Sequence, residues 1–316
     1  MKFLIDGHCD TIEKALDNKL SLQDKKLSFN LCDAAQLNIP IIQMAAAFIS
    51  PGNQNSFQRA KTIFKYFFEQ KEKLGDKIIQ IQSNNDIDKV IAENKLGIVL
   101  TIENGSAIED NLDNVDFFCH QGVKVMSITW NNDNLLGCGA LTKNDNGLTE
   151  FGKKYIQKLN QKNMLIDVSH SSQKTFWDTS KISEDTVVAT HSCCYHLCSH
   201  PRNLTDEQIR QIAAMNGIIG ICYCTQFLSE TGRATTKEIV DHIDYIANLV
   251  GIDYVGLGSD FDGLEEEDIP KNLKGISQIN NLIQELQNRG FDEDEIQKIL
   301  GENWLRVLQT RKTILS

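Results

Sequence analysis

Short apolar runs recur along this chain, and five of them lead directly into a histidine or an acidic residue. These residues are His8 with Asp10, Glu103, His170, His191 and Asp260. Apolar runs of this length, bounded by glycine or polar residues, are typical of strands buried on both faces of a parallel sheet. The pattern therefore restricts the chain to folds in which several parallel strands bring polar side chains together at their carboxyl ends.

Eight apolar runs alternate with helical patterns, which is the order expected of repeated βα units. We expect strands near residues 3–8, 39–48, 97–103, 123–130, 164–170, 186–191, 217–224 and 254–260. A length of 316 residues suits a (β/α)8 barrel, which runs to about 250 residues or more as one unit. The sequence therefore predicts an α/β protein, a (β/α)8 TIM barrel, formed by residues 1–316 as a single domain with C-terminal helices.

The segments between these strands carry the helical patterns. Helices are expected over residues 56–74, 149–162, 206–215, 236–250, 276–288 and 292–309. Thr205, with Gln208 three residues later, is the signature of a capping box at the start of one helix. Residues 77–94 add a strand-like piece and a helix to the minimal barrel, and Gly301 is expected to break the last helical stretch.

The composition excludes several classes of protein. A net charge of −11 excludes nucleic acid as a partner, because phosphate backbones are bound by basic patches. There is no apolar run of about 18 residues, so no membrane span is expected. The nine cysteines form no CxxC pair and no secretion signal precedes the first strand, so we expect reduced thiols in a cytoplasmic protein. A redox or metal role for Cys222 and Cys224 stays open.

The first pair of candidates, His8 and Asp10, stands at the end of the first strand. Side chains two residues apart lie on the same side of a strand, so the two can hold one divalent ion such as zinc. Taken alone, a buried histidine bonded to a backbone carbonyl and an aspartate at a helix start would be the simpler interpretation. Because other strands also end in ligand-type residues, we favour the metal site.

The other candidates predict a second ion beside the first. His170 and His191 end two consecutive strands, and each offers a neutral nitrogen. Burying Glu103 is costly unless it is paired or metal-bound, and its two oxygens can bridge two ions. Two neighbouring ions can hold a shared water, lower the pKa of that water and polarise a substrate carbonyl. Asp260 can accept a proton from that water and pass it to a leaving amine, so the sequence predicts a metal-dependent hydrolase.

Several motifs resemble those of a known family. They are His8-Cys9-Asp10-Thr11, Glu103-Asn104-Gly105, Asp167-Val168-Ser169-His170, Thr190-His191-Ser192, His200-Pro201-Arg202-Asn203 and Gly258-Ser259-Asp260-Phe261-Asp262-Gly263. In this order, and with a closing helix over residues 301–308, they resemble the membrane dipeptidase (renal dipeptidase) family of zinc peptidases. The resemblance covers almost the whole chain.

The resemblance implies an amidohydrolase-like barrel and a binuclear zinc dipeptidase that hydrolyses small dipeptides through a metal-bridging hydroxide. It assigns His8 and Asp10 to one zinc ion, His170 and His191 to the other, and Glu103 to the bridge. Zinc could be replaced by another divalent metal. The family also implies a homodimer.

The resemblance further assigns Asp260 to proton transfer and Arg202 to the terminal carboxylate of the substrate, which suits a planar guanidinium fork. An alternative for Arg202 is a surface arginine. Tyr223, in the stretch Cys222-Tyr223-Cys224, is a third candidate substrate contact, although related proteins often carry Asn, Phe and Tyr at these three places.

Trp130 is the main departure from the family, because animal members carry a histidine there that contacts the substrate carbonyl region. We expect Trp130 to face the metals and to form a wall of the substrate pocket, with Thr129 and Asn131 turned away from it. The alternative is a core tryptophan packed between strand and helix. These departures leave two further functions open: a hydrolase of another small amide, such as a lactam or an N-acyl amino acid, and a metal-binding homologue with reduced catalysis. Retention of Asp260 argues against the latter.

Overall fold

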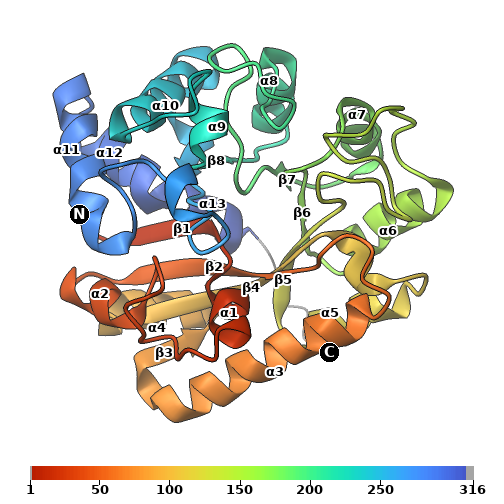
Figure 1. The fold of residues 1–316 in the computed structure, drawn as a ribbon, viewed down its shortest axis with the longest axis horizontal. Coiled ribbons are helices and arrows are strands. Elements are labelled where there is room, and N and C mark those ends of the chain that lie inside the picture. Colours follow the sequence, from red (N-terminus) through yellow and green to blue (C-terminus); the bar gives the residue numbers. More distant parts are fainter. Residues whose placement is uncertain (1, 311–316) are drawn as a thin grey trace.

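The strands form one parallel sheet that closes into a barrel (Figure 1). The computed structural model describes residues 2–310. The strands are β1 Leu4–Cys9, β2 Ile41–Phe48, β3 Ile78–Gln80, β4 Leu96–Glu103, β5 Val123–Ser127, β6 Leu165–Asp167, β7 Val187–Val188, β8 Ile219–Ile221 and β9 Val255–Leu257. Their order is β7-β6-β5-β4-β2-β1-β9-β8, and a parallel bridge between Ala189 and Ile219 joins the two ends of this path. The predicted (β/α)8 TIM barrel is confirmed.

The longest strand pair shows why these runs become strands. β2 and β4 stay in register from Ile41 opposite Leu96 to Phe48 opposite Glu103. Every residue of β4 is buried, as expected for a parallel strand covered on both faces. Glu103 is the last residue of this strand, so the apolar run carries a carboxylate to the carboxyl end of the barrel.

Helices cover the outside of the barrel (Figure 1). They are α1 Thr11–Asp17, α2 Leu31–Gln36, α3 Ser56–Leu74, α4 Asn84–Glu93, α5 Asp113–His120, α6 Glu150–Gln161, α7 Gln173–Ile182, α8 Asp206–Ala214, α9 Thr225–Leu228, α10 Thr236–Val250, α11 Ile279–Arg289, α12 Glu293–Gln297 and α13 Asn303–Gln309. Each helix predicted from the sequence is present. The capping box of Thr205 and Gln208 is formed at the start of α8, and β3 with α4 is the predicted addition to the minimal barrel.

The predicted break at Gly301 is wrong. Residues Lys298–Glu302 form a π-helical turn that continues from α12 into α13. A Cβ at Gly301 would lie 2.7 Å from the Phe3 ring, so the missing side chain allows the helix to approach the start of β1. The glycine is therefore explained by close packing rather than by the end of a helix.

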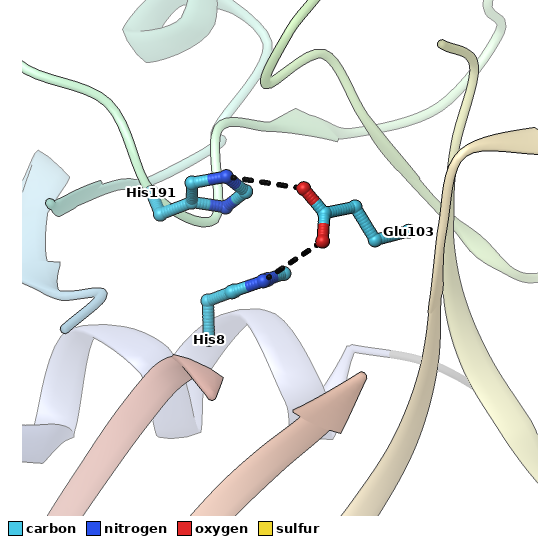
Figure 2. Close-up of side chains that lie close together, drawn as sticks. All are labelled: His8, Glu103 and His191. Carbon is cyan, nitrogen blue, oxygen red and sulfur yellow. Dashed lines mark ion pairs between the residues drawn. The ribbon is translucent and has the colours of Figure 1, made fainter. Parts of the chain in front are cut away.

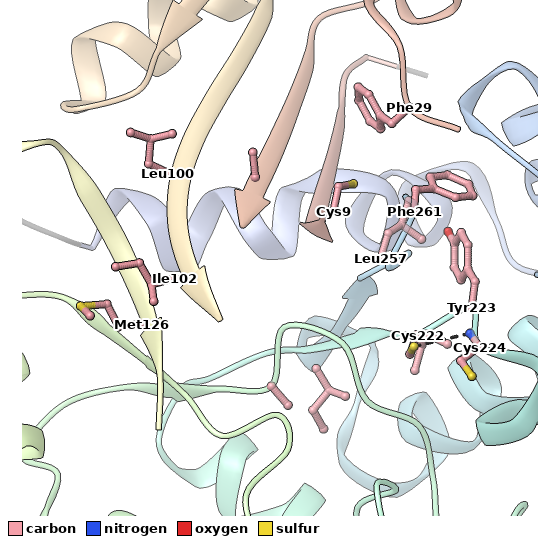
Figure 3. Packing of buried hydrophobic residues seen from close by; sticks show 14 of the residues in the cluster. Cys9, Phe29, Leu100, Ile102, Met126, Cys222, Tyr223, Cys224, Leu257 and Phe261 are labelled. Carbon is pink, nitrogen blue, oxygen red and sulfur yellow. Dashed lines mark hydrogen bonds between the residues drawn. The ribbon is translucent and has the colours of Figure 1, made fainter. Parts of the chain in front are cut away.

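Two apolar clusters hold the barrel together. The larger one lies between strands and helices and includes Leu100, Ile102 and Met126 on β4 and β5 (Figure 3). The smaller one takes Val99 from β4 and residues from most other strands, and it ends on Trp304 of α13. Side chains on a strand alternate between faces, so Val99 and Glu103 share the inner face of the barrel. Glu103, at the end of β4, therefore points to the barrel axis, as the apolar side chains below it do.

Within residues 2–310, no helix has both the length and the apolar character that a membrane span requires.

Candidate metal centre

The predicted ligand residues converge at the carboxyl ends of the barrel strands. His8 lies in β1, Asp10 follows it at the start of α1, Glu103 ends β4, and His170, His191 and Asp260 follow β6, β7 and β9. All are buried except Asp260, which is half-buried. In a barrel of this kind the loops at this end of the strands form the active site.

Glu103 lies at the middle of this group. Its Oε2 atom is 3.5 Å from Nε2 of His8, and its Oε1 atom is 3.7 Å from Nε2 of His191 (Figure 2). The same Oε1 atom lies 2.8 Å from Nε2 of His170. The two oxygens of one carboxylate thus face histidines from three different strands, an arrangement compatible with the predicted bridge.

The donor atoms form two overlapping groups that could each hold a divalent ion. One group is His8, Glu103 and His191, and the other is His8, Asp10 and Asp260; within each, the donor atoms lie within 4.8 Å of one another. His170 adjoins the first group, because its Nε2 atom is 2.8 Å from Nε2 of His191. Neutral imidazoles and carboxylates at such spacing are the donor set that zinc takes in proteins.

Two buried atoms at the centre indicate that these residues fit a cation. Nε2 of His8 and Oδ1 of Asp10 have no hydrogen-bond partner among the residues that the structure describes. A buried polar atom without a partner is costly, and a coordinated cation would satisfy both atoms at once. The donor set and its unpaired atoms therefore fit the divalent ions predicted from the sequence.

The surroundings of His170 and His191 lower the pKa values of both histidines. Burial, and next to it the nearby Arg202 guanidinium, lowers the pKa of His170 to about 3. Burial and the charge of His8 hold the pKa of His191 well below its usual range. Two histidines are therefore neutral at neutral pH and have lone pairs to offer.

The remaining groups of the centre, His8, Asp10 and Asp260, all have raised pKa values. Burial favours neutral His8, but the Asp10 and Glu103 carboxylates outweigh it and raise the pKa of His8 well above its usual range. Burial also raises the pKa of Asp10, and burial together with the charge of Asp10 raises the pKa of Asp260 well above its usual range. Negative charge at the centre is therefore costly without a counter-ion, which a cation would supply.

Asn131 supports His170, contrary to the expectation that it turns away from the site. Its Oδ1 atom lies 2.8 Å from Nδ1 of His170. An amide oxygen only accepts, so Nδ1 of His170 carries the proton and its Nε2 lone pair is directed to the centre. The expectation fails because β5 ends at Ser127, and strand alternation does not extend to Asn131.

Trp130 lies beside the same histidine. Its ring is stacked on His170 with centroids 5.8 Å apart, and Phe48 at the end of β2 lies 5.5 Å away on a tilted plane. Trp130 is half-buried rather than enclosed in the core. This position agrees with a place at the mouth of the barrel, whereas its contact with substrate stays a prediction.

Arg202 and Tyr223 are both buried near the loops of the site. Arg202 donates from Nη2 to the backbone oxygen of His191 at 3.1 Å, and its Nε atom has no partner within residues 2–310. It is not the surface arginine of the alternative interpretation, since it is 3% exposed. The Tyr223 ring packs edge-to-face against Phe261 (Figure 3), and its substrate contact stays a prediction.

Two residues beside the site were not predicted from the sequence: Asn131 bonds to His170, and Phe48 packs on Trp130. Cys222, for which a redox or metal role was left open, directs its thiol to Oδ2 of Asp260 at 3.6 Å. Asp167 was quoted only as part of a motif. An aspartate inside an apolar strand requires buried donors, and that requirement is the signal that could have marked it.

The fold and this group of donors together define a metal-dependent hydrolase on a (β/α)8 barrel. The sequence profile of the membrane dipeptidase family (peptidase family M19) matches residues 2–315, and the chain belongs to this family of metallopeptidases. A Klebsiella pneumoniae protein described as an uncharacterised protein in the pqqA 5' region is 36% identical over 234 residues, which is 71% of this chain and 85% of that protein.

Two solved structures illustrate the similarity in fold. A metallopeptidase from Rhodobacter sphaeroides, liganded with a phosphinate mimic of the dipeptide L-Ala-D-Ala, aligns with a TM-score of 0.89 at 23% identity and covers 98% of this chain and 99% of its own. An amidohydrolase from Pseudomonas aeruginosa aligns with a TM-score of 0.84 at 26% identity, over 97% and 95% of the two chains.

Proposed function

We propose that this member of the family is a binuclear zinc dipeptidase that cleaves small dipeptides, including those with a D-residue at the C-terminal position. The observation that carries the proposal is the meeting of three histidines and three carboxylates at one end of the barrel, around Nε2 of His8, which has no hydrogen-bond partner within residues 2–310. Buried charges of this kind persist where they coordinate metals.

Each zinc ion would have its own residues. Asp10 and His8 would hold one ion, His170 and His191 the other, and Glu103 would contact both through its two oxygens. When bound, such a pair supplies an activated water and polarises the peptide carbonyl. Because the Glu103 carboxylate faces His8 with one oxygen and His170 with the other, it also fixes the relative position of the two proposed ion sites.

Asp260 would move the proton. Its backbone N–H donates to the carbonyl of His8 at 3.0 Å, which holds the side chain beside the centre. Its carboxylate lies in one cluster with the donor atoms of His8 and Asp10, which is the position that a general acid or base at this centre needs. It would take a proton during attack and give it to the leaving amine.

Arg202 and the aromatic residues would select the substrate. The buried Nε atom of Arg202 is a free donor for the terminal carboxylate of a dipeptide, while Nη2 is fixed on the His191 carbonyl. Trp130 and Phe48 would border the other side of the pocket and limit the size of the substrate. The dipeptide mimic bound by the Rhodobacter metallopeptidase supports the choice of a D-residue.

A dipeptide library assay on protein of known metal content tests the proposal. Each dipeptide is offered with L- and with D-stereochemistry at the C-terminal residue, beside its N-acetylated and C-amidated forms and a small lactam. We expect hydrolysis of free dipeptides and loss of cleavage on C-amidation, because amidation removes the carboxylate. Preference for the lactam or for N-acyl amino acids would contradict the proposal, as would absence of all hydrolysis by the zinc-loaded protein.

A further inference from the structure

Asp167 is a buried carboxylate that belongs to neither group of proposed ligands. It is the last residue of β6 and is 3% exposed. Leu165, two residues earlier, belongs to the cluster inside the barrel, so Asp167 also points into the barrel. A carboxylate in this position has to be held by hydrogen-bond donors.

The donors come from the loops that carry two of the histidines. Oδ1 of Asp167 accepts the backbone N–H groups of Ser169 at 2.9 Å and Thr190 at 3.0 Å. These residues directly precede His170 and His191. Oδ2 accepts the hydroxyl of Thr190 at 2.7 Å. Asp167 therefore links the carboxyl ends of β6 and β7.

The Thr190 hydroxyl also faces two imidazoles. Its oxygen lies 2.9 Å from Nδ1 of His191 and 3.4 Å from Nδ1 of His8. A hydroxyl has one proton to donate, and a short bond to a carboxylate is the strongest of its options. The Ser169 hydroxyl lies farther off, at 3.4 Å. Because the Thr190 hydroxyl donates its hydrogen bond to Asp167, its oxygen can only accept hydrogen bonds from the imidazoles.

We propose that Asp167 is a positioning residue that acts through Thr190. Asp167 accepts the hydrogen bond of the Thr190 hydroxyl. The hydroxyl oxygen can then only accept from the imidazoles, which keeps the protons of His8 and His191 on Nδ1 and leaves the lone pairs of both Nε2 atoms directed to the metal ions. The inference rests on the proposed function, because this tautomer matters only where the two imidazoles bind a metal.

The decisive substitution is Asp167→Asn. The amide keeps an oxygen for the two backbone N–H groups but places an NH2 group against Thr190. The hydroxyl proton is then free to turn to Nδ1 of His191, and the tautomer with a proton on Nε2 cannot bind a cation. We expect zinc affinity to fall about 10- to 100-fold, the usual effect of losing a partner behind a metal ligand. Titration of metal-free protein with zinc, in competition with a chromophoric chelator, measures this affinity.

Asp6→Asn is the matched control. Asp6 is 2% exposed, and its Oδ1 accepts the backbone N–H groups of His8 at 3.3 Å and Ser259 at 2.8 Å. Its Oδ2 accepts the Cys9 thiol instead of a hydroxyl that touches a histidine. The control removes an equally buried carboxylate without changing a tautomer, so zinc affinity is expected to stay near that of the wild type.

A second pair of variants tests the hydroxyl itself. Thr190→Ser keeps the relay and should keep zinc affinity, whereas Thr190→Val removes it and should lose affinity as Asp167→Asn does. This pair decides the question if Asp167→Asn does not fold. The melting temperature of each metal-free variant separates loss of stability from loss of affinity, because a purely structural role lowers the first alone.

Equal zinc affinity in Asp167→Asn and wild type, or an equal loss in Asp167→Asn and Asp6→Asn, overturns the inference and leaves the proposed function intact. Equal affinity in the serine and valine variants of Thr190 has the same meaning. Failure of the wild-type protein to bind any zinc overturns the proposed function, and this inference with it.

Discussion

The Nε2 atoms of His170 and His191 lie 2.8 Å apart, although the residues belong to separate βα units. Nδ1 of His170 is bonded to the Asn131 amide oxygen, and burial helps to keep both rings neutral, so two lone pairs would face each other. Lone pairs repel unless a proton or a cation lies between them. The short separation therefore marks the place where a cation would contribute most.

We predict that the purified protein binds two divalent ions per chain, with zinc preferred. Elemental analysis measures the ratio after dialysis against trace zinc. Because ions bind the folded state, their removal by a chelator should lower the free energy of unfolding, by about 4 kcal/mol for each site at which free zinc had been 1,000 times its Kd. A chain that holds no ion, and gains no activity on addition of zinc, cobalt or manganese, would contradict the prediction.

Glu103→Gln should reduce activity more than replacement of His170 or His191 alone. Glutamine keeps the shape but lacks the charge, and the carboxylate faces His8 of one proposed ion site and His170 of the other. We expect ion affinity to fall beyond the roughly 100-fold known for partners behind a metal ligand. Competition titration and kcat/KM measure the effect. Glu109→Gln, an exposed residue of the same loop, is the control, and near-wild-type turnover of Glu103→Gln would exclude the bridge.

Asp260→Asn should leave the ions in place and lower kcat about 10²-fold or more, the scale of losing a general acid or base. The amide preserves the bond of its own backbone to His8 but cannot accept a proton. Steady-state kinetics and elemental analysis on the same sample test this. Loss of an ion from the variant would instead make Asp260 a ligand, as its closeness to His8 and Asp10 allows.

His242 should make stability depend on pH. Its Nδ1 atom accepts the N–H of Cys194 at 3.0 Å and Nε2 donates to the Leu228 oxygen at 3.1 Å, and burial lowers its pKa from 6.5 to about 4. Between pH 6.5 and about 4, His242 is therefore protonated in the unfolded chain but neutral in the folded chain. Stability is full above pH 6.5 and is lost as the pH falls to about 4, by about 3 kcal/mol from this group.

The comparison that isolates this term uses metal-free protein unfolded in urea between pH 4.5 and 8. His242→Gln should be less stable at pH 8 but should depend less on pH than the wild type. His120→Gln, which alters an exposed histidine of α5, is the comparison for loss of a histidine outside the core. A wild-type slope retained in His242→Gln would show that other groups cause it.

The barrel could be predicted because its strands are buried on both faces. The run before Glu103 is apolar except for Thr101, and β4 follows it residue by residue to the carboxylate. Such a run is a local pattern, so it can be recognised from the sequence alone. The convergence of the ligand residues follows from strand polarity in the same way.

The details around the ligands could not be predicted, because they depend on irregular backbone. His170 and Asp260 have positive φ angles of 67° and 62°, values uncommon for residues other than glycine, and no periodicity describes them. The bond of Asn131 to His170 joins residues 39 positions apart, beyond the end of a strand. The link of Asp167 to Thr190 depends on strand pairing, which a single sequence does not specify.

Trp130→His tests whether the tryptophan belongs to the substrate pocket. Its ring is half-buried and stacks on His170, with Phe48 beside it. Under the pocket interpretation, the substitution should change substrate preference or rate with little loss of stability, since few core contacts are removed. Under the core interpretation it should chiefly destabilise the fold, by about 3 kcal/mol, near the lower end for truncated aromatic residues.

The deciding measurements are the melting temperature of Trp130→His and its specific activity per folded molecule on a panel of dipeptides. Trp177→His is the matched control, because Trp177 is also half-buried but packs on Phe176 in α7. We expect Trp130→His to alter the dipeptide profile and Trp177→His to leave it unchanged. A lower melting temperature with an unchanged profile in Trp130→His would rule out the pocket role.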